Sequence, residues 1–119
     1  MKNRPLHQRT LFGIAGLCDG WRREKAFRSQ AIALGLAIIV LIILQPPAWA
    51  AALLIAGLVV ALAMETMNGA VEALADRLHP DRHEAIRIAK DMSSAAVLIL
   101  NIANAVLAAW LVLENITLG

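Results

Sequence analysis

The chain has 119 residues, of which 60% are hydrophobic and 4% aromatic, and it carries a formal net charge of +2. This length suits a single domain, but the high apolar fraction excludes an ordinary soluble core. We therefore expect residues 1–119 to form one membrane domain. The single cysteine, Cys18, excludes an intramolecular disulfide.

The N-terminal segment predicts a helix that lies on a membrane surface. Residues 1–28 contain seven of the eleven lysines and arginines. Within about residues 9–28, Leu11, Ile14 and Trp21 recur at helical spacing, and charged residues lie opposite them. Such a basic, amphipathic helix suits the interface of an anionic membrane.

The next segment predicts two membrane spans. Residues 29–64 carry no charge, and one helix of this length would measure about 54 Å, whereas a bilayer core is about 30 Å thick. Pro46-Pro47 divides the run, so we expect a first span at 29–45 and a second at 48–76 with a cytoplasmic extension. A signal peptide is disfavoured because a long charged region precedes the apolar run and a second span follows it directly.

A third span follows a polar connection. Residues 77–91 contain Pro80 and several charges, which predicts a cytoplasmic loop and the start of a helix. Residues 92–113 carry no charge and form the third span. With the N-terminus in the cytoplasm, both basic clusters obey the positive-inside rule. Asn101 and Asn104, one turn apart in this span, predict hydrogen bonds to a neighbouring helix.

One face of the second long helix collects polar side chains where the apolar run ends. At about 100° per residue, Glu65, Asn68, Glu72 and Asp76 fall within about an 80° sector. Three carboxylates at the end of so apolar a helix need a binding partner or a chemical role. This face is therefore the candidate site.

Three further residues, Glu24, Lys90 and Asp91, are expected at the same cytoplasmic level because the hairpin goes out and returns. Carboxylate and amide oxygens are hard ligands that suit Mg²⁺. A lysine can hold a phosphate group, and a further carboxylate can act as a general base. These groups suit Mg²⁺-assisted phosphoryl transfer to a lipid hydroxyl, although no nucleotide fingerprint is present. The alternative is that the acids only form salt bridges with Arg28, Arg77, Arg82 and Arg87.

Three blocks carry a family resemblance. They are Trp21-x-x-Glu24-x-Ala26-Phe27-Arg28; Glu65-x-x-Asn68-x-Ala70-Val71-Glu72-x-x-x-Asp76 followed by His83-Glu84; and Ala89-Lys90-Asp91-Met92-x-Ser94-Ala95-Ala96-Val97-Leu98. Over about residues 11–110 the chain resembles the small prokaryotic integral-membrane diacylglycerol kinases. The resemblance implies an all-α membrane fold, with an N-terminal surface helix and three transmembrane helices, assembled as a homotrimer with active sites shared between subunits. It also implies transfer of the ATP γ-phosphate to diacylglycerol, giving phosphatidate, in the bacterial inner membrane.

The resemblance implies roles for individual positions. Glu65 occupies the general-base position, and Glu24 and Glu72 occupy the Mg²⁺ positions beside the nucleotide phosphates, with Asn68 and Asp76 in support. The implied nucleotide contacts are Glu24, Glu72, Asp81, Arg82, His83, Lys90 and Asp91. The implied lipid contacts are Trp21, Ala26, Phe27, Arg28, Ser29, Gln30, Glu65 and Ser94. The expected partners are a membrane lipid, ATP and further copies of the chain, and no nucleic acid.

The chain also departs from the family pattern. Gly69 stands where the signature usually has Ser or Thr, and Ala75 stands in place of Val. Gln30 replaces an acid, and Phe12 replaces a tyrosine. Undecaprenol kinases share the fold, so undecaprenol is the alternative lipid. A small oligomeric proton-coupled transporter is the alternative of another class, but a transporter places its essential acid near the middle of a span, and these acids crowd one end.

Overall fold

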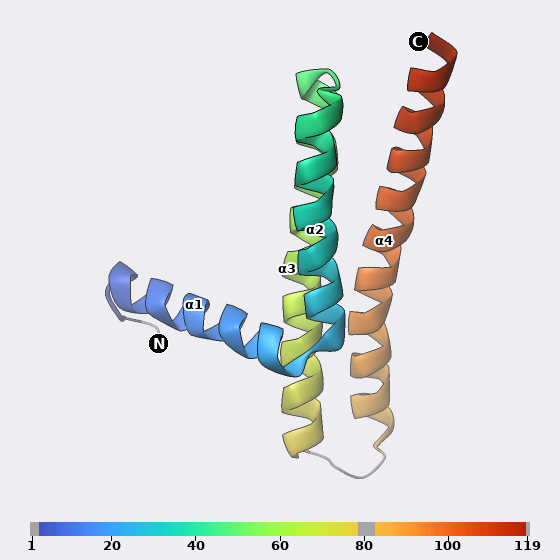
Figure 1. Cartoon of the computed structure of the whole chain (residues 1–119). Helices are drawn as coiled ribbons and strands as arrows, with labels where there is room; N and C mark the ends of the chain where they lie inside the picture. Colours follow the sequence, from blue (N-terminus) through green and yellow to red (C-terminus); the bar gives the residue numbers. More distant parts are fainter. Residues whose placement is uncertain (1–2, 79–82, 119) are drawn as a thin grey trace.

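The computed structural model describes residues 3–78 and 83–118, and this part of the chain is helical, with no strand. Four helices follow one another: α1 Leu6–Arg23, α2 Lys25–Leu44, α3 Ala48–Leu78 and α4 Glu84–Leu118. The helices α2, α3 and α4 are each long and apolar enough to cross a membrane. The predicted all-α fold with three spans is thus confirmed. Figure 1 shows the three long helices side by side and α1 projecting sideways from them.

The three long helices keep their large apolar side chains on the outside. Ile43, Val59 and Val106, for example, are all exposed. This arrangement is stable when lipid tails rather than water surround the helices. The buried positions between helices are held mainly by small residues such as Ala61 and Ala75, which let the helix backbones approach closely.

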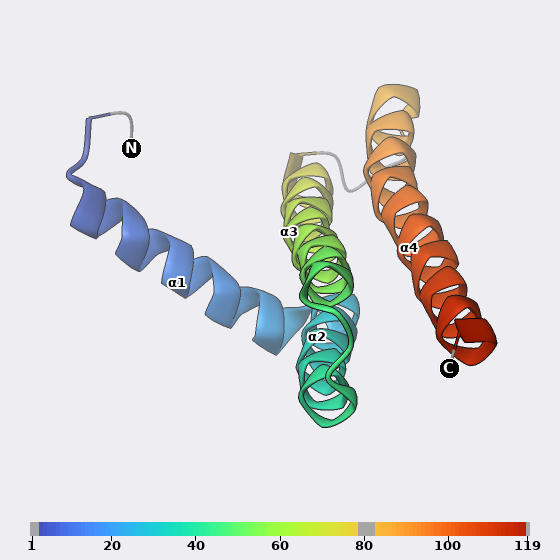
Figure 2. The ribbon, with the colours of Figure 1, turned by 90° about the horizontal axis from the view of Figure 1, so that it is seen from above.

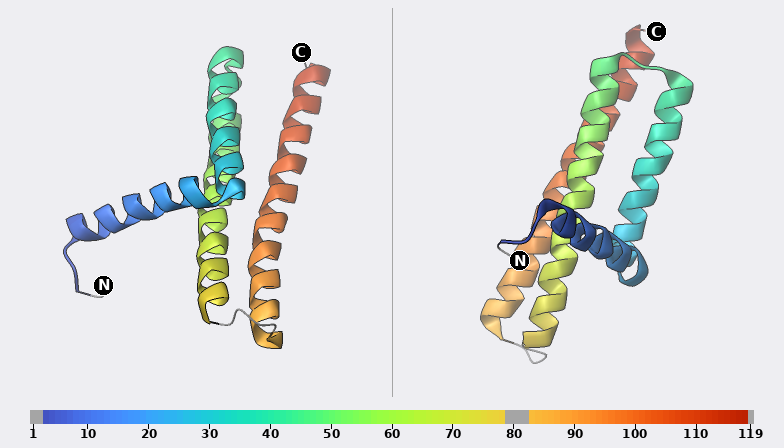
Figure 3. Two further views of the ribbon diagram at one scale, coloured as in Figure 1. Left: turned by 60° about the horizontal axis from the view of Figure 1, so that its bottom comes forward. Right: turned by 90° about the vertical axis from the view of Figure 1, so that its left-hand side faces the viewer.

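The turn between α2 and α3 follows from Pro46-Pro47, which cannot continue a helix. Gln45 takes a left-handed conformation with φ 47°, and its N–H donates to the Leu41 carbonyl at 2.9 Å. The Pro47 carbonyl then accepts the N–H of Ala50 at 3.0 Å in the first turn of α3. The two helices therefore form an antiparallel hairpin, which is seen from the side in the right panel of Figure 3.

The first helix ends earlier than the amphipathic pattern predicts. The pattern runs to residue 28, but α1 ends at Arg23, and Glu24 is extended, with φ −113° and ψ 109°. Arg28, in the next helix, donates from Nη1 to the Trp21 carbonyl at 2.8 Å. It thereby satisfies a carbonyl that the end of α1 leaves open. The chain changes direction at Glu24, so α1 leaves the bundle sideways, as the view from above shows (Figure 2).

Helix α3 is the central element of the bundle. Both α2 and α4 pack along α3, whereas the backbones of α2 and α4 do not approach each other closely in the described part of the chain. Asn104 Nδ2 donates to the Gly57 carbonyl of α3 at 2.9 Å, and Gln30 Nε2 of α2 donates to Asn101 Oδ1 at 2.7 Å. The prediction that Asn101 and Asn104 bond to neighbouring helices is confirmed.

Candidate active site

Glu65 is the buried carboxylate of α3, with only 7% of its surface exposed. Burying a carboxylate is costly unless polar groups compensate for the lost water. The Asn68 side chain lies one turn away and close enough to interact with the Glu65 carboxylate, and Glu24 and Glu72 lie near enough to repel its charge. The three predicted glutamates therefore gather within one chain. No ion pair among the described residues involves any of the three, which disfavours the alternative that they serve only as salt-bridge partners.

Glu24 reaches α3 at Gly69. A Cβ built on Gly69 would lie 3.4 Å from Cγ and 3.6 Å from Cδ of Glu24. The Glu24 carboxylate thus lies over the α3 backbone, between the turns that carry Glu65 and Glu72. Glycine at position 69 lets Glu24 lie directly against the α3 backbone, where the family signature has a hydroxyl-bearing side chain.

The break between α1 and α2 holds Glu24 in this position. Its N–H donates to the Gly20 carbonyl at 2.9 Å, and its carbonyl accepts the N–H of Arg28 at 3.1 Å. Phe27 is buried against Gly20, so closely that a Cβ on Gly20 would lie 2.9 Å from the ring. Backbone hydrogen bonds and ring packing together fix the orientation of the break.

Asn68 is held from the opposite helix. Ser93 Oγ of α4 donates to Asn68 Oδ1 at 2.5 Å, and both side chains are partly buried. Sequence reasoning did not single out Ser93. The available signal was its position one turn after Lys90, on the face of α4 that turns toward the polar face of α3.

Ion pairs flank the site where α3 ends and α4 begins. Lys90 Nζ lies 2.9 Å from Asp76 Oδ1 and so joins α4 to α3. Arg87 Nη1 lies 2.7 Å from Asp91 Oδ2, one turn apart within α4. Lys90 also lies within electrostatic range of Glu72. Lys90 is therefore the cation on the described part of α4 that faces the acidic cluster, whereas Asp91 is paired along its own helix.

The donor chemistry of the cluster fits Mg²⁺. Glu24 and Glu72 offer carboxylate oxygens near Glu65 that no cation in the described residues occupies. The described residues contain no ready-made group of three metal-binding side chains. Such a group is not needed, because Mg²⁺ is usually bound through one or two carboxylates together with phosphate oxygens and water.

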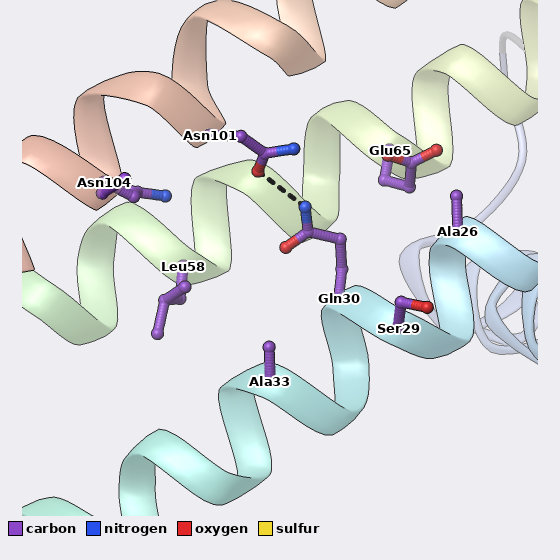
Figure 4. A pocket seen from close by; sticks show the side chains of 9 residues that line it. Ala26, Ser29, Gln30, Ala33, Leu58, Glu65, Asn101 and Asn104 are labelled. Carbon is purple, nitrogen blue, oxygen red and sulfur yellow. Dashed lines mark hydrogen bonds between the residues drawn. The ribbon is translucent and has the colours of Figure 1, made fainter.

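A pocket of about 560 Å³ opens beside Glu65, where α2 and α4 diverge over α3. Side chains from all three helices face this space, and the Gln30–Asn101 hydrogen bond crosses it (Figure 4). Its lining includes Ala26, Ser29, Gln30, Leu58, Glu65, Asn101 and Asn104. The pocket is polar near Glu65 and opens among helices with apolar outer faces, which suits a lipid whose polar end approaches the carboxylate.

The other predicted lipid contacts fall into two groups. Ala26, Ser29 and Gln30 line the pocket. Phe27 packs inside the break, and Arg28 bonds to the Trp21 carbonyl. Trp21, Phe27 and Arg28 therefore contribute to the α1–α2 break and do not line the pocket.

The remaining predicted contacts lie on α4 and the connection before it. Ser94 is exposed on α4. His83 Nδ1 accepts the N–H of Ala85 at 3.2 Å at the start of the helix. Asp81 and Arg82 lie outside the described residues.

Comparison with known proteins gives a consistent result. The family model described as prokaryotic diacylglycerol kinase matches residues 11–113. A diacylglycerol kinase of Escherichia coli K12 is 40% identical over 84 residues, which cover 71% of this chain and 69% of that protein. A diacylglycerol kinase of Pseudomonas aeruginosa is 38% identical over 87 residues, covering 73% and 71%. One from a Sinorhizobium species is 36% identical over 109 residues, covering 88% and 80%.

Proposed function

We infer that this chain, which belongs to the prokaryotic diacylglycerol kinase family, is a lipid kinase that phosphorylates diacylglycerol to phosphatidate. A kinase of this family uses a nucleotide as phosphoryl donor, and we propose that the donor is ATP. The observation that carries the site assignment is that buried Glu65 both lines the pocket and adjoins the Glu24 and Glu72 carboxylates. One carboxylate is thereby available to the lipid and two to the metal-bound nucleotide.

Glu65 is proposed as the general base. The lipid enters the pocket with its free hydroxyl toward Glu65, and the carboxylate accepts the hydroxyl proton as the oxygen attacks the γ-phosphorus. The new bond joins the lipid oxygen to phosphorus, the bond from phosphorus to the bridging oxygen breaks, and the nucleoside diphosphate leaves. Burial supports this role because it excludes bulk water that would compete with the lipid hydroxyl.

Glu24 and Glu72 are proposed to hold Mg²⁺ beside the nucleotide phosphates. Bound Mg²⁺ supplies charge neutralisation for the phosphoryl oxygens during transfer. Lys90 is proposed to contact a phosphate oxygen, and its ion pair with Asp76 supports this role by holding the ammonium toward the cluster. Asp81, Arg82, His83 and Asp91 remain proposed nucleotide contacts.

The remaining proposals concern the lipid contacts. Ala26, Ser29 and Gln30 are proposed to contact the lipid directly, since they share the pocket with Glu65. Trp21, Phe27 and Arg28 are proposed to act at the α1–α2 break beside the lipid, and Ser94 to contact it from α4.

The assembly and the orientation are also proposed. A homotrimer is supported by the thinness of a bundle in which, among the described residues, only the backbone of α3 packs closely along both other spans. Placement in the bacterial inner membrane, with the N-terminus and the site in the cytoplasm, is supported by the basic residues. All eleven lysines and arginines lie in residues 2–28 and 77–90, the two segments that the proposed orientation places in the cytoplasm.

The experiment that tests the function uses purified protein in mixed micelles with radiolabelled ATP and Mg²⁺. Diacylglycerol is supplied in one set of reactions and undecaprenol in a second set. We expect labelled phosphatidate and far less labelled undecaprenyl phosphate. Label in undecaprenol alone would replace the proposed lipid, and label in neither would contradict the kinase assignment.

A further inference from the structure

The polar cluster around Glu65 extends one residue beyond the groups assigned so far. Asn68 follows Glu65 by one turn on the same face of α3, so its amide lies near the Glu65 carboxylate. The oxygen of the same amide accepts the Ser93 hydroxyl at 2.5 Å from the facing helix. Ser93, Asn68 and Glu65 therefore form a continuous row of polar side chains, in which a hydrogen bond joins Ser93 to Asn68.

The two ends of the Asn68 amide have opposite chemistry. Its NH₂ group donates hydrogen bonds, and its oxygen only accepts them. A carboxylate is stabilised by the NH₂ end and repelled by the oxygen. If the amide turned over, its oxygen would face Glu65, and the base would lose a donor and gain a repulsive neighbour.

Ser93 supplies the contact that selects one orientation. Its hydroxyl donates to the amide oxygen, which leaves the NH₂ end for Glu65. The Lys90 carbonyl lies 3.2 Å from the same hydroxyl, but a hydroxyl has one proton to donate, and the bond to Asn68 is the shorter one. Because both side chains are partly buried, water competes poorly for this bond.

We propose that Ser93 is a positioning residue for the phosphoryl transfer, acting through Asn68 to hold the Glu65 carboxylate in its productive orientation. This inference rests on the proposed role of Glu65 as the base. Ser93 touches neither the lipid nor the nucleotide, so it affects the rate of transfer and not the binding of either substrate.

The test compares kcat and the KM values for ATP and diacylglycerol in mixed micelles. For Ser93→Ala we expect kcat to fall about fivefold, the effect of one ordinary hydrogen bond, with both KM values unchanged within about twofold. Ser93→Thr, which keeps the hydroxyl, should restore the rate. If Ser93→Ala does not fold, Ser93→Cys replaces it, because a thiol of similar size is a weak donor.

A double-mutant cycle separates positioning from simple packing. Because Ser93 acts through Asn68, adding Ser93→Ala to Asn68→Ala should cause no further loss of kcat. The matched control is Thr66→Val, next to Glu65. The Thr66 hydroxyl bonds only to the Leu62 carbonyl of its own helix, at 2.8 Å. This control should retain the parental kcat.

Three outcomes would overturn the inference. The first is a parental kcat in Ser93→Ala, and the second is a full additional loss in the double mutant. The third is an equal loss in Thr66→Val. Glu65→Gln distinguishes a failure of the proposed Ser93 role from a failure of the proposed Glu65 base. If Glu65→Gln is inactive and the cycle is additive, only the role of Ser93 fails, whereas an active Glu65→Gln removes the proposed base itself.

Discussion

Glu24, at the break between α1 and α2, and Glu72, on α3, contribute carboxylates to one acidic cluster beside Gly69. If they hold Mg²⁺, removal of either one weakens the metal, because Mg²⁺ relies on very few protein ligands. We expect Glu24→Ala or Glu72→Ala to raise the Mg²⁺ concentration for half-maximal activity about tenfold, which corresponds to about 1.4 kcal/mol of binding. A Mg²⁺ titration of lipid phosphorylation measures this change.

The control for this titration is Asp19→Ala, which removes an exposed carboxylate from α1. It should leave the Mg²⁺ dependence at the parental value. An unchanged titration in both Glu24→Ala and Glu72→Ala would refute their assignment as metal ligands.

At the residue scale, helical periodicity was sufficient to predict which site residues lie together when they belong to the same helix. Glu65, Asn68 and Glu72 were expected on one face because the geometry of a single helix is local. The Ser93–Asn68 bond and the contact of Glu24 with Gly69 join residues from different helices. Such contacts depend on the rotation and height of each packed helix, which no local pattern specifies.

At the scale of elements, the α1–α2 break connects the surface helix to the site. Gly20 has no room for a side chain, because a Cβ would lie 2.9 Å from the buried Phe27 ring. Gly20→Ala therefore has to displace the ring and with it the segment that carries Glu24. We expect a loss of about 1–3 kcal/mol in stability, the usual cost of overpacking. We also expect a higher Mg²⁺ concentration for half-maximal activity, because the ring displacement moves Glu24.

The matched control for the break is Gly13→Ala. A Cβ on Gly13 meets nothing within 4 Å, and alanine is the better helix former. Thermal unfolding in detergent and the Mg²⁺ titration should separate the two variants. Equal behaviour of Gly20→Ala and Gly13→Ala would show that the packing of Phe27 does not position Glu24.

The elements differed in how far the sequence predicted them. The uncharged runs and Pro46-Pro47 indicated three spans, because bilayer thickness and proline chemistry impose strong local rules. The end of α1 was not predicted. It depends on Arg28 reaching back to the Trp21 carbonyl and on Phe27 packing against Gly20, contacts that form only across the break.

At the scale of the whole molecule, the proposed orientation places α1 and the acidic cluster on the cytoplasmic side and the Gln45 turn on the opposite side. Single cysteines introduced into a Cys18→Ser background test this. Asp19→Cys should react with a membrane-impermeant maleimide in inverted vesicles and not in spheroplasts. Gln45→Cys should show the reverse pattern, and an exchange of the two patterns would contradict the orientation.

The whole-molecule arrangement also supports the proposal that lipid and nucleotide meet at Glu65. The pocket opens among the membrane-spanning helices. The Lys90–Asp76 pair instead joins the start of α4 to the end of α3. Glu65 lies between these two regions. Composition and charge predicted this division between an apolar and a polar end, but they could not show that α2 and α4 diverge to leave the pocket open.

Whether Glu65 is the base can be measured by comparing the parent enzyme with Glu65→Gln in diacylglycerol micelles, with ATP and Mg²⁺ supplied. A glutamine keeps the size of the side chain but cannot accept the hydroxyl proton as a base. We expect phosphatidate formation to fall at least about 100-fold, the usual contribution of a general base, with nucleotide binding retained. A near-parental rate of phosphatidate formation in Glu65→Gln would contradict it.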